Sequence, residues 1–312
     1  MTEAQYDEAR PGPHRPRLSV VIPNYNDGRF FERCLCAVIS QSRPADEIIV
    51  YDDGSTDDSL ERLEELRRRW PQVRVVVLGT NQGVVSVVNR ALTEITGDWV
   101  HFLAVDDCPL PGLYQLAMEK AVQHPQSGVL FGAFVTAHEQ TGERFTETAD
   151  KWIGPGYISP KRMVWSLFHK APALFSLGYT NIWRTEVLRE VGGFIPELGP
   201  YCDTVAFRCA SAKHGGVYLG GSPVVCVRVS SDTYGGQVWK DIPKYSKIMA
   251  LAAEIMRTRY LDLFPERYLR NWEAKVYSEI GLKPWPKWRR AKHGLSLALY
   301  LFWIWATRRL GR

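Results

Sequence analysis

The stretch "DEIIVYDDGSTDDSLERLEELRRRW", which runs from Asp46 to Trp70, decides the fold. It opens with a short apolar run, "IIVY", which is typical of a strand covered on both faces of a parallel sheet. Two adjacent carboxylates, Asp52 and Asp53, end that run. The remainder has an amphipathic helical pattern, and Ser55 or Asp57 is placed to cap the helix. A strand, a polar turn and a helix in succession form the basic unit of an α/β fold.

Short β-branched runs alternate with amphipathic stretches along the first half of the chain. Further strands are predicted at "LSVVIP" (18–23), "VRVVVL" (73–78), "WVHFLAV" (99–105) and "GVLFGAFVTA" (128–137), and helices at "FFERCLCAVISQ" (30–41) and "VVSVVNRALTEIT" (84–96). A later run, "GGVYLGGSPVVCVRVS" (215–230), suggests an antiparallel strand. The sequence therefore predicts a doubly wound, mostly parallel mixed sheet flanked by helices, with a helical extension at the C-terminus.

Three regions differ in composition within the 312 residues. Residues 1–17 are polar and proline-rich and lack the apolar stretch of a secretory signal, so we expect a disordered leader on a cytoplasmic chain. Residues 18–235 carry the α/β pattern, and residues 236–312 form the helical extension. The six cysteines show neither zinc-site spacing nor the density of a disulfide scaffold, which favours reduced thiols.

The net charge of +5 is concentrated in the C-terminal tail. Beyond Glu279 the tail has lysines and arginines but no acidic side chain, which argues against a nucleic-acid groove on the main domain. Its apolar run "LSLALYLFWIWA" (295–306) is shorter than the ~20 residues of a membrane-spanning helix, and basic and aromatic residues flank it. Two interpretations remain open: an interfacial helix that makes the protein peripheral on the anionic cytoplasmic face of a membrane, or a helix buried against protein.

Polar residues follow three of the predicted parallel strands, and the carboxyl ends of such strands share one edge where ligands bind. The residues concerned are Pro23, Tyr25, Asp52, Asp53, Asp106 and Asp107. Carboxylates gathered in one crevice repel one another unless hydrogen-bond donors or a cation keep them ionised. A sugar nucleotide with Mg²⁺ or Mn²⁺ would supply both, because these ions bridge carboxylates to phosphates. The alternative is that each pair of aspartates merely forms a turn or a helix cap.

Other phosphate-binding arrangements do not fit the sequence. The chain lacks both the glycine fingerprint of a Rossmann dinucleotide site and the P-loop motif. A receiver-like phosphoacceptor domain would need its acidic residues after the first and third strands, which differs from the order here. Tyr25 is placed either to stack on a base or simply to pack, and Asp52 is placed to accept a hydrogen bond from the edge of a base.

Five segments together resemble the family 2 glycosyltransferases, which have the GT-A fold. They are "SVVIPNYN", "DEIIVYDDGSTDDS", "NQGVVSVVNRAL", "TGDWVHFLAVDD" and "VGGFIPELGPYCD", and they cover roughly residues 18–230. The resemblance implies an inverting, nucleotide-sugar-dependent transferase of the hexosyltransferase type, using Mn²⁺ or Mg²⁺. It also implies a place in the synthesis of cell-envelope polysaccharide.

The resemblance gives each site residue a role by its position. Tyr25 and Asp52 would contact the base, Asp106 the ribose or sugar, and Asp107 the metal bound to the diphosphate. Two further residues would shape a loop beside the nucleotide. The whole donor-binding set is Pro23, Tyr25, Asp52, Asp53, Asn81, Gly83 and Asp106, with Asn81 and Gly83 as the loop residues.

The predicted catalytic base is Asp203. Inverting transfer needs a carboxylate that takes the proton of the acceptor hydroxyl as this oxygen attacks the anomeric carbon. In the family the base is the aspartate of a Glu-Asp pair after "GGF"; here Asp203 has that position and Cys202 replaces the glutamate. Asp203 is also placed to cap the following helix, whose dipole would keep it ionised. Ala104 and Val88 stand where the family often has Asp and Arg, so diphosphate contacts would come from elsewhere, for example from Arg90.

We therefore expect a metal-dependent enzyme that moves a single sugar to a hydroxyl of a glycan or lipid-linked glycan. The Q-x-x-R-W element of processive polysaccharide synthases is absent, which favours a single addition. The alternative is a non-catalytic protein that binds nucleotide sugars or acts as a membrane scaffold, in which Ala104 and Cys202 mark lost chemistry.

Overall fold

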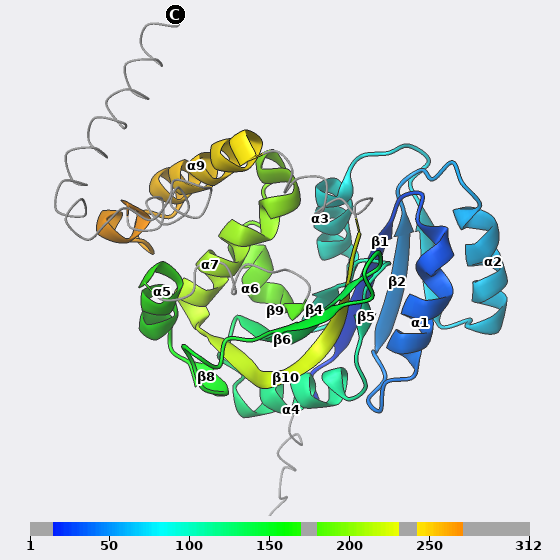
Figure 1. The fold of residues 1–312 in the computed structure, drawn as a ribbon, viewed down its shortest axis with the longest axis horizontal. Coiled ribbons are helices and arrows are strands. Elements are labelled where there is room, and N and C mark those ends of the chain that lie inside the picture. The colour runs from blue at the N-terminus through cyan, green and yellow to red at the C-terminus, as the bar shows by residue number, and fades with distance from the viewer. Residues whose placement is uncertain (1–14, 170–179, 231–241, 271–312) are drawn as a thin grey trace, which may run out of the picture. The chain divides into compact units, whose positions relative to one another are not determined.

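The computed structural model describes residues 15–169, 180–230 and 242–270 (Figure 1). Packing divides the chain into two compact units, Met1–Thr233 and Tyr234–Arg312. The strands of the first unit are β1 (Leu18–Asn24), β2 (Glu47–Asp52), β3 (Val73–Val77), β4 (Trp99–Phe102), β5 (Cys108–Pro109), β6 (Val129–His138), β7 (Arg144–Glu147), β8 (Gly156–Ile158), β9 (Ile182–Arg184) and β10 (Gly216–Val229). Its helices are η1 (Gly28–Phe30), α1 (Phe31–Ile39), α2 (Ser59–Arg69), α3 (Val84–Glu94), α4 (Leu113–Gln123), α5 (Pro160–His169), α6 (Thr185–Glu190), η4 (Pro196–Tyr201) and α7 (Cys202–His214).

A ten-stranded mixed sheet organises the first unit, with the order β3-β2-β1-β4-β9-β6-β10-β5. β1 is parallel to β2 and β4, β2 to β3, and β6 to β10. β9 lies antiparallel between β4 and β6, while β5 and β8 pair antiparallel with β10 and β7 with β6. The predicted doubly wound, mostly parallel mixed sheet is confirmed. Residues 215–230, expected to come from an antiparallel portion, pair antiparallel with β5 and β8 and parallel with their long partner β6.

Helices cover both faces of the sheet (Figure 1). Leu18, Val20 and Ile22 of β1 point to one face, in a core that they share with α1, α2 and α4. Because successive side chains of a strand alternate between faces, Val21 points the other way, and α3 packs against β1 there. The central strand β9 brings Trp183 into the core on this side of the molecule, fully buried against aromatic neighbours.

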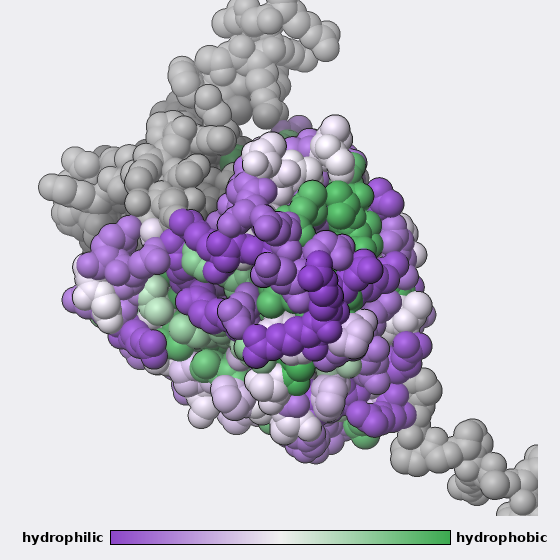
Figure 2. Space-filling model, turned by 90° about the vertical axis from the view of Figure 1, so that its right-hand side faces the viewer, coloured by the Kyte–Doolittle hydropathy of each residue, from purple (hydrophilic) through white to green (hydrophobic). Residues whose placement is uncertain are grey.

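Figure 2 views the molecule from the side of α1 and α2 and shows a largely hydrophilic face. Ion pairs such as Arg62–Asp58 lie along α2, and Leu63 is buried beneath them. Of the two predicted caps of this helix, Asp57 accepts the N–H of its first residue at 3.0 Å. Ser55 does not cap the helix and bonds to Asp52 instead.

The second unit contains α9 (Ile242–Arg259), followed by a turn and by helical residues from 266 to 270, where the described residues stop. Arg257 donates to both carboxylate oxygens of Glu266, at 3.2 and 3.0 Å, which ties this turn to the end of α9. In the described part of the chain, no helix has both the length and the apolarity to cross a membrane. The basic, apolar tail and most of the leader lie outside the described residues.

Candidate active site

The carboxyl ends of the parallel strands meet at one edge of the sheet, which we call the carboxyl edge. β1 and β2 are in register there, with Asn24 opposite Asp52, and β4 runs in the same direction as β1. β9 is antiparallel to both β4 and β6, so β6 and its parallel partner β10 also end at this edge. The structure therefore brings the carboxylates that follow β2 and β4 to one edge, together with the end of β10.

Asp52 is fully buried and joins the ends of two strands. Its Oδ2 accepts hydrogen bonds from the Asn24 amide at 2.9 Å and the Ser55 hydroxyl at 2.6 Å, and its Oδ1 accepts the Ser55 N–H at 2.9 Å. The Oδ1 of Asn24 is buried and has no hydrogen-bond partner among the described residues. The structure thus gives Asp52 a role within the protein, and its direct contact with a base stays a prediction.

Asp53 holds the loop that precedes α3. Its two oxygens accept the N–H groups of Gln82 and Gly83, each at 2.8 Å, and the Asn81 side chain also accepts from Gly83, at 3.0 Å. Gly83 has φ +84° and ψ 147°, a conformation that favours glycine. Asp53 is 3 % exposed. Both oxygens of Asp53 are thus used to hold the loop. The contact of Asp53, Asn81 and Gly83 with a nucleotide stays a prediction.

Tyr25 presents an exposed ring at the end of β1, in contrast to the buried aspartates. Its side chain is 44 % exposed, while Pro23 is partly buried within the strand. The next residue, Asn26, has φ +58°, and its Oδ1 accepts the N–H groups of Thr56 and Asp57 at 2.7 and 3.3 Å. These bonds fix the turn, so the ring of Tyr25 remains available for stacking.

Asp106 and Asp107 lie in the loop after β4 and are less well satisfied by the protein. Burial raises the pKa of Asp106, although Arg228 opposes the rise. Burial, together with repulsion from Asp106, raises the pKa of Asp107 well above its ordinary value. Asp107 is 2 % exposed and the Asp106 side chain 18 %. A cation beside the pair would favour the ionised form of both groups.

The carboxylate oxygens of Asp106 and Asp107 are the kind of ligand that a divalent cation prefers. The Oδ1 of Asp107 accepts the Arg228 N–H at 2.9 Å, whereas no described residue donates to its Oδ2. The described residues contain no cluster of three or more His, Cys, Asp or Glu side chains that could hold a metal. A cation here would therefore need substrate oxygens, and Mg²⁺ is usually held by one or two carboxylates together with substrate phosphates.

Asp203 lies in the first turn of α7 and is not its N-cap. The helix begins at Cys202, and Tyr201 occupies the N-cap position without a side-chain hydrogen bond. The predicted capping role of Asp203 is therefore wrong by position. A carboxylate in the first turn still gains from the helix dipole, because the unpaired N–H groups there carry partial positive charge.

The direction of α7 places Asp203 toward the carboxyl edge. The last turns of α7 lie against Gly128, at the start of β6, through Ala210 and His214. One turn earlier, Phe207 packs edge to face on Phe131, further along β6. The helix therefore runs antiparallel to β6, and its N-terminus points to the edge where that strand ends.

Comparisons with known proteins agree with this geometry. The model of glycosyl transferase family 2 matches residues 19–178, which is more than half of the chain. The chain belongs to glycosyl transferase family 2. It is 37% identical over 107 residues to the uncharacterized glycosyltransferase YibD of Escherichia coli (strain K12), which is 34% of this chain and 31% of that protein. It is 36% identical over 93 residues to the putative teichuronic acid biosynthesis glycosyltransferase TuaG of Bacillus subtilis (strain 168), covering 30% and 37%. The matches thus span about a third of these relatives' length.

Solved structures show that this family 2 member has the GT-A fold. Residues 1–349 of S. aureus TarS in complex with UDP-GlcNAc match with a TM-score of 0.66 at 20% identity, over 84% of this chain and 72% of that one. The mannosyltransferase PcManGT from Pyrobaculum calidifontis, in complex with GDP-Man and Mn²⁺, matches with a TM-score of 0.54 at 19% identity, over 94% and 84%. At these identities the likeness concerns the fold alone, and it confirms the fold predicted from the sequence.

Three residues at the carboxyl edge of this family 2 glycosyltransferase were not predicted from the sequence. Asn24 and Ser55 hold Asp52, and Arg228 contacts both Asp106 and Asp107. Arg228 had a signal, because it is the single charge within the apolar run "VVCVRVS".

Arg90, suggested as a diphosphate contact, is occupied elsewhere. It pairs with Glu94 on the same helix at 3.0 Å, and Glu94 also accepts the Tyr51 hydroxyl at 2.8 Å. The structure therefore gives no support to Arg90 as a diphosphate ligand.

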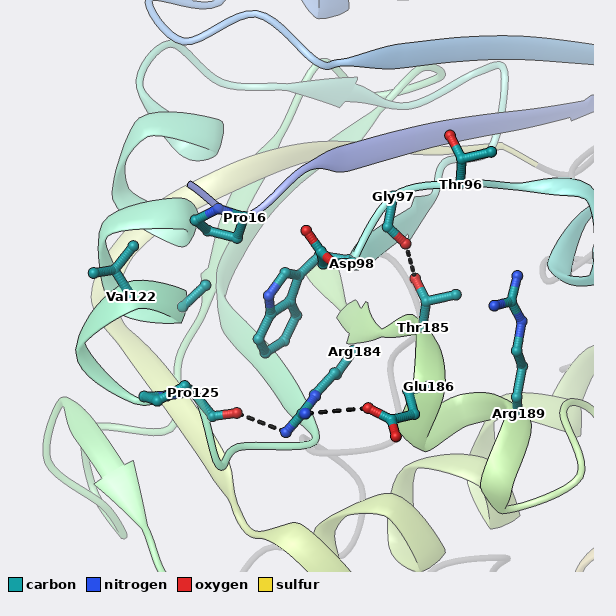
Figure 3. Close-up of a pocket in the computed structure, with 12 residues that line it drawn as sticks. Pro16, Thr96, Gly97, Asp98, Val122, Pro125, Arg184, Thr185, Glu186 and Arg189 are labelled. Atoms are coloured by element: carbon teal, nitrogen blue, oxygen red, sulfur yellow. Dashed lines mark hydrogen bonds and ion pairs between the residues drawn. The ribbon is translucent and has the colours of Figure 1, made fainter. Parts of the chain in front are cut away.

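A pocket of about 510 Å³ lies at the opposite, amino edge of the sheet (Figure 3). Arg184 donates to the Pro125 carbonyl at 2.6 Å and pairs with Glu186 at 3.2 Å. Thr185 donates to the Gly97 carbonyl at 2.7 Å. Arg184, Thr185 and Glu186 thus bond within the lining of the pocket itself, so its volume alone does not identify it as the active site of this glycosyltransferase.

Proposed function

We propose that the protein transfers a single hexosyl residue from a nucleotide sugar to a hydroxyl of a glycan or lipid-linked glycan, with inversion. The observation that carries the proposal is the Asp106–Asp107 pair at the carboxyl edge, where the Oδ2 of Asp107 has no donor among the described residues. TarS was solved with UDP-GlcNAc and PcManGT with GDP-Man, which supports a nucleotide sugar as donor. The name of TuaG supports cell-envelope polysaccharide as the acceptor class.

The donor would lie along the carboxyl edge, with its base on the exposed ring of Tyr25. The buried acceptor oxygen of Asn24 and the adjacent Asp52 lie where the base edge would be read. Asp106 would bind the ribose or sugar. The remaining donor-binding residues, which shape the edge from β1, β2 and the loop before α3, are Pro23, Asp53, Asn81 and Gly83.

Asp107, with Asp106 beside it, would hold Mn²⁺ or Mg²⁺. When bound, the ion neutralises the charge that develops on the departing nucleoside diphosphate. The raised pKa values of both carboxyl groups support this assignment, because a nearby cation favours their ionised form. PcManGT was solved with Mn²⁺, which supports the same ion class.

Asp203 would act as the general base. Its carboxylate takes the proton of the acceptor hydroxyl while that oxygen forms a bond to the anomeric carbon. The bond from this carbon to the diphosphate oxygen breaks on the opposite face, which inverts the configuration. The position of Asp203 in the first turn of α7, toward the carboxyl edge, favours the ionised form that a base requires.

Attachment to the cytoplasmic face of a membrane is a separate part of the proposal and rests on the sequence of the tail alone. The basic and apolar residues 283–312 lie outside the described residues. Flotation of the full chain with anionic liposomes at low salt tests it. A chain that stays with the soluble fraction contradicts the interfacial helix and favours burial of the tail against protein.

A thermal-shift screen of nucleotide sugars with and without Mn²⁺ tests the donor site. A selective donor at 100 times its Kd stabilises the native state by about 2.7 kcal/mol. We expect one donor to raise the unfolding temperature strongly, and more with Mn²⁺ than with EDTA. Transfer or slow hydrolysis of that donor then supports catalysis. Binding without turnover favours the non-catalytic alternative, and no response to any donor contradicts the proposal.

A further inference from the structure

Two arginines from distant parts of the chain grip Asp106. Arg33, on α1, donates to the Asp106 carbonyl oxygen, and the Nη1 of Arg228, on β10, lies 3.5 Å from Oδ2 of Asp106. Both guanidinium groups lie over the ring of Phe30, 5.6 Å and 4.6 Å from its centroid. We call Phe30, Arg33 and Arg228 the arginine clamp.

Arg228 is held more firmly than a surface arginine. Its side chain is 7 % exposed, its Nη2 donates to the Glu139 carboxylate, and its guanidinium rests on Phe30. Stacking of a guanidinium on an aromatic ring and pairing with a carboxylate each fix the plane of the group. Glu139 directly follows β6, the strand with which β10 pairs, so the sheet holds Glu139 beside Arg228.

The same residue reaches both carboxylates of the proposed donor site by different groups. Its backbone N–H donates to Oδ1 of Asp107 at 2.9 Å, and its guanidinium pairs with Asp106. The backbone contact depends on the position of β10 and survives a change of side chain. A substitution of Arg228 therefore removes the side-chain contact with Asp106 and leaves the backbone hydrogen bond to Asp107 in place.

We propose that Arg228 is a positioning residue that sets the orientation of Asp106 toward the donor. It acts through Asp106, with Phe30 and Glu139 fixing its guanidinium. Without the guanidinium, the partly buried Asp106 carboxylate has no cation paired with it, and repulsion from Asp107 turns it away from the orientation that the donor needs. This inference rests on the proposed function, because it assumes that the donor binds at Asp106.

Kinetics of Arg228→Gln and Arg228→Lys test the role in donor binding. Loss of a residue that orients a ligating group typically costs ~10–100-fold in affinity. We expect Arg228→Gln to raise the donor KM by that factor with a much smaller change in kcat, and Arg228→Lys to recover part of the loss. The matched control is Arg184→Gln, which removes an arginine paired with a glutamate at the amino edge and leaves the donor KM unchanged.

A second measurement keeps the two proposals distinguishable. Thermal unfolding of Arg228→Gln, Asp106→Asn and the double variant, without ligand, reports the contact itself. We expect the double variant to unfold at a higher temperature than the sum of the two single losses predicts. If the losses in unfolding temperature are additive, the proposed contact between Arg228 and Asp106 is overturned, even if the enzyme is active. A drop in kcat with an unchanged donor KM also overturns the positioning role, because it marks a merely structural one. A non-additive pair in a protein that binds no nucleotide sugar overturns the proposed function and, with it, the donor role of Arg228.

Discussion

Two carboxylates at opposite edges of the sheet, Asp46 at the amino edge and Asp107 at the carboxyl edge, have opposite surroundings. At the amino edge, burial pushes the pKa of Asp46 upward, but hydrogen bonds from the Leu18 N–H and from Arg43 outweigh it, and the pKa lies below its ordinary value. At the carboxyl edge, burial and the neighbouring Asp106 raise the pKa of Asp107 well above its ordinary value. The described residues give Asp46 donors from both Leu18 and Arg43, whereas Asp107 receives only the backbone N–H of Arg228, on Oδ1.

This difference supports the proposal that the ligand binds at the carboxyl edge. Stability alone would favour donors around Asp107 of the kind that surround Asp46, since an unpaired buried charge is costly. Groups with perturbed pKa values cluster at functional sites, where the ligand completes what the protein leaves open. In the amino-edge pocket, by contrast, Arg184, Thr185 and Glu186 already bond to residues of the pocket's own lining.

The largest expected effect is on kcat and compares substitutions at the two ends of α7. Asp203→Asn removes the proposed base, and we expect kcat to fall ~10²- to 10⁴-fold while the donor still shifts the unfolding temperature. The control is Glu190→Gln, because Glu190 pairs with Lys213 and His214 at the other end of the helix. Transfer rates measured with one donor and acceptor decide the outcome. Near-normal turnover of Asp203→Asn removes Asp203 from the mechanism.

A smaller effect is expected on the free energy of unfolding, which should fall more in Asp52→Asn than in Asp98→Asn. In Asp52→Asn an NH₂ group would face donors of Asn24 and Ser55, so we expect the free energy of unfolding to fall by about 1.5–3 kcal/mol. Asp98 accepts the Arg17 N–H at an exposed position of the amino edge, and Asp98→Asn should cost less. Urea unfolding at pH 7 measures both. Equal losses of unfolding free energy in the two variants would contradict the contrast between the buried, hydrogen-bonded Asp52 and the exposed Asp98.

The same glycine substitution should act by different causes at the two edges. Gly83→Ala is strained by φ +84°, although its Cβ meets nothing within 4 Å, and costs ~1–3 kcal/mol. Gly97→Ala places a Cβ 2.7 Å from the Ser19 nitrogen and costs ~1–3 kcal/mol through overlap. We expect only Gly83→Ala to weaken the response to donor in a thermal-shift assay. A weakened response in Gly97→Ala as well would show that donor binding senses stability in general.

The subtlest test is the pH dependence of stability in EDTA. Folded Asp107 holds its proton more tightly than in the unfolded chain, so the free energy of unfolding falls as pH rises from its ordinary pKa toward the raised one; Asp107→Asn should remove this fall. Asp46 acts in the opposite sense. Its contribution is present at neutral pH and is lost as pH falls through its lowered pKa, so Asp46→Asn should flatten the acid side of the curve. Identical pH profiles for both variants and the wild type would contradict the contrast.

The long strands of the fold could be predicted from sequence because each carries its own signal. The apolar runs of β1 and β2 end in polar residues, and the structure has strands there; the strand predicted over 99–105 is shorter, because β4 ends at Phe102. β5 and β9 span two and three residues, too short to show a period. β5 is a strand because it pairs with β10, and β9 because it pairs with β4 and β6. Such pairing is a property of the assembled sheet and not of the short segment itself.

The candidate site could be predicted in its location but not in its hydrogen bonds. Adjacent aspartates at strand ends indicate the carboxyl edge, since parallel strands share it. The burial of Asp52 depends on Asn24, on the neighbouring strand, and the clamp on Asp106 depends on Arg228, on β10. Contacts over such sequence distances follow from the strand order, which spacing along the chain does not give.

The path of α7 and β10 has a consequence for acceptor choice. The chain leaves the carboxyl edge at Asp203, reaches the amino edge at Gly216 and returns to Arg228, so one helix and one strand link the proposed base to the proposed donor site. β10 already tolerates a register shift between Tyr218 and Val225. An insertion or deletion at that irregularity would change the register in which β10 brings Arg228 to Asp106 while α7 keeps Asp203 in place, which offers evolution a way to alter the proposed donor site without moving the proposed base.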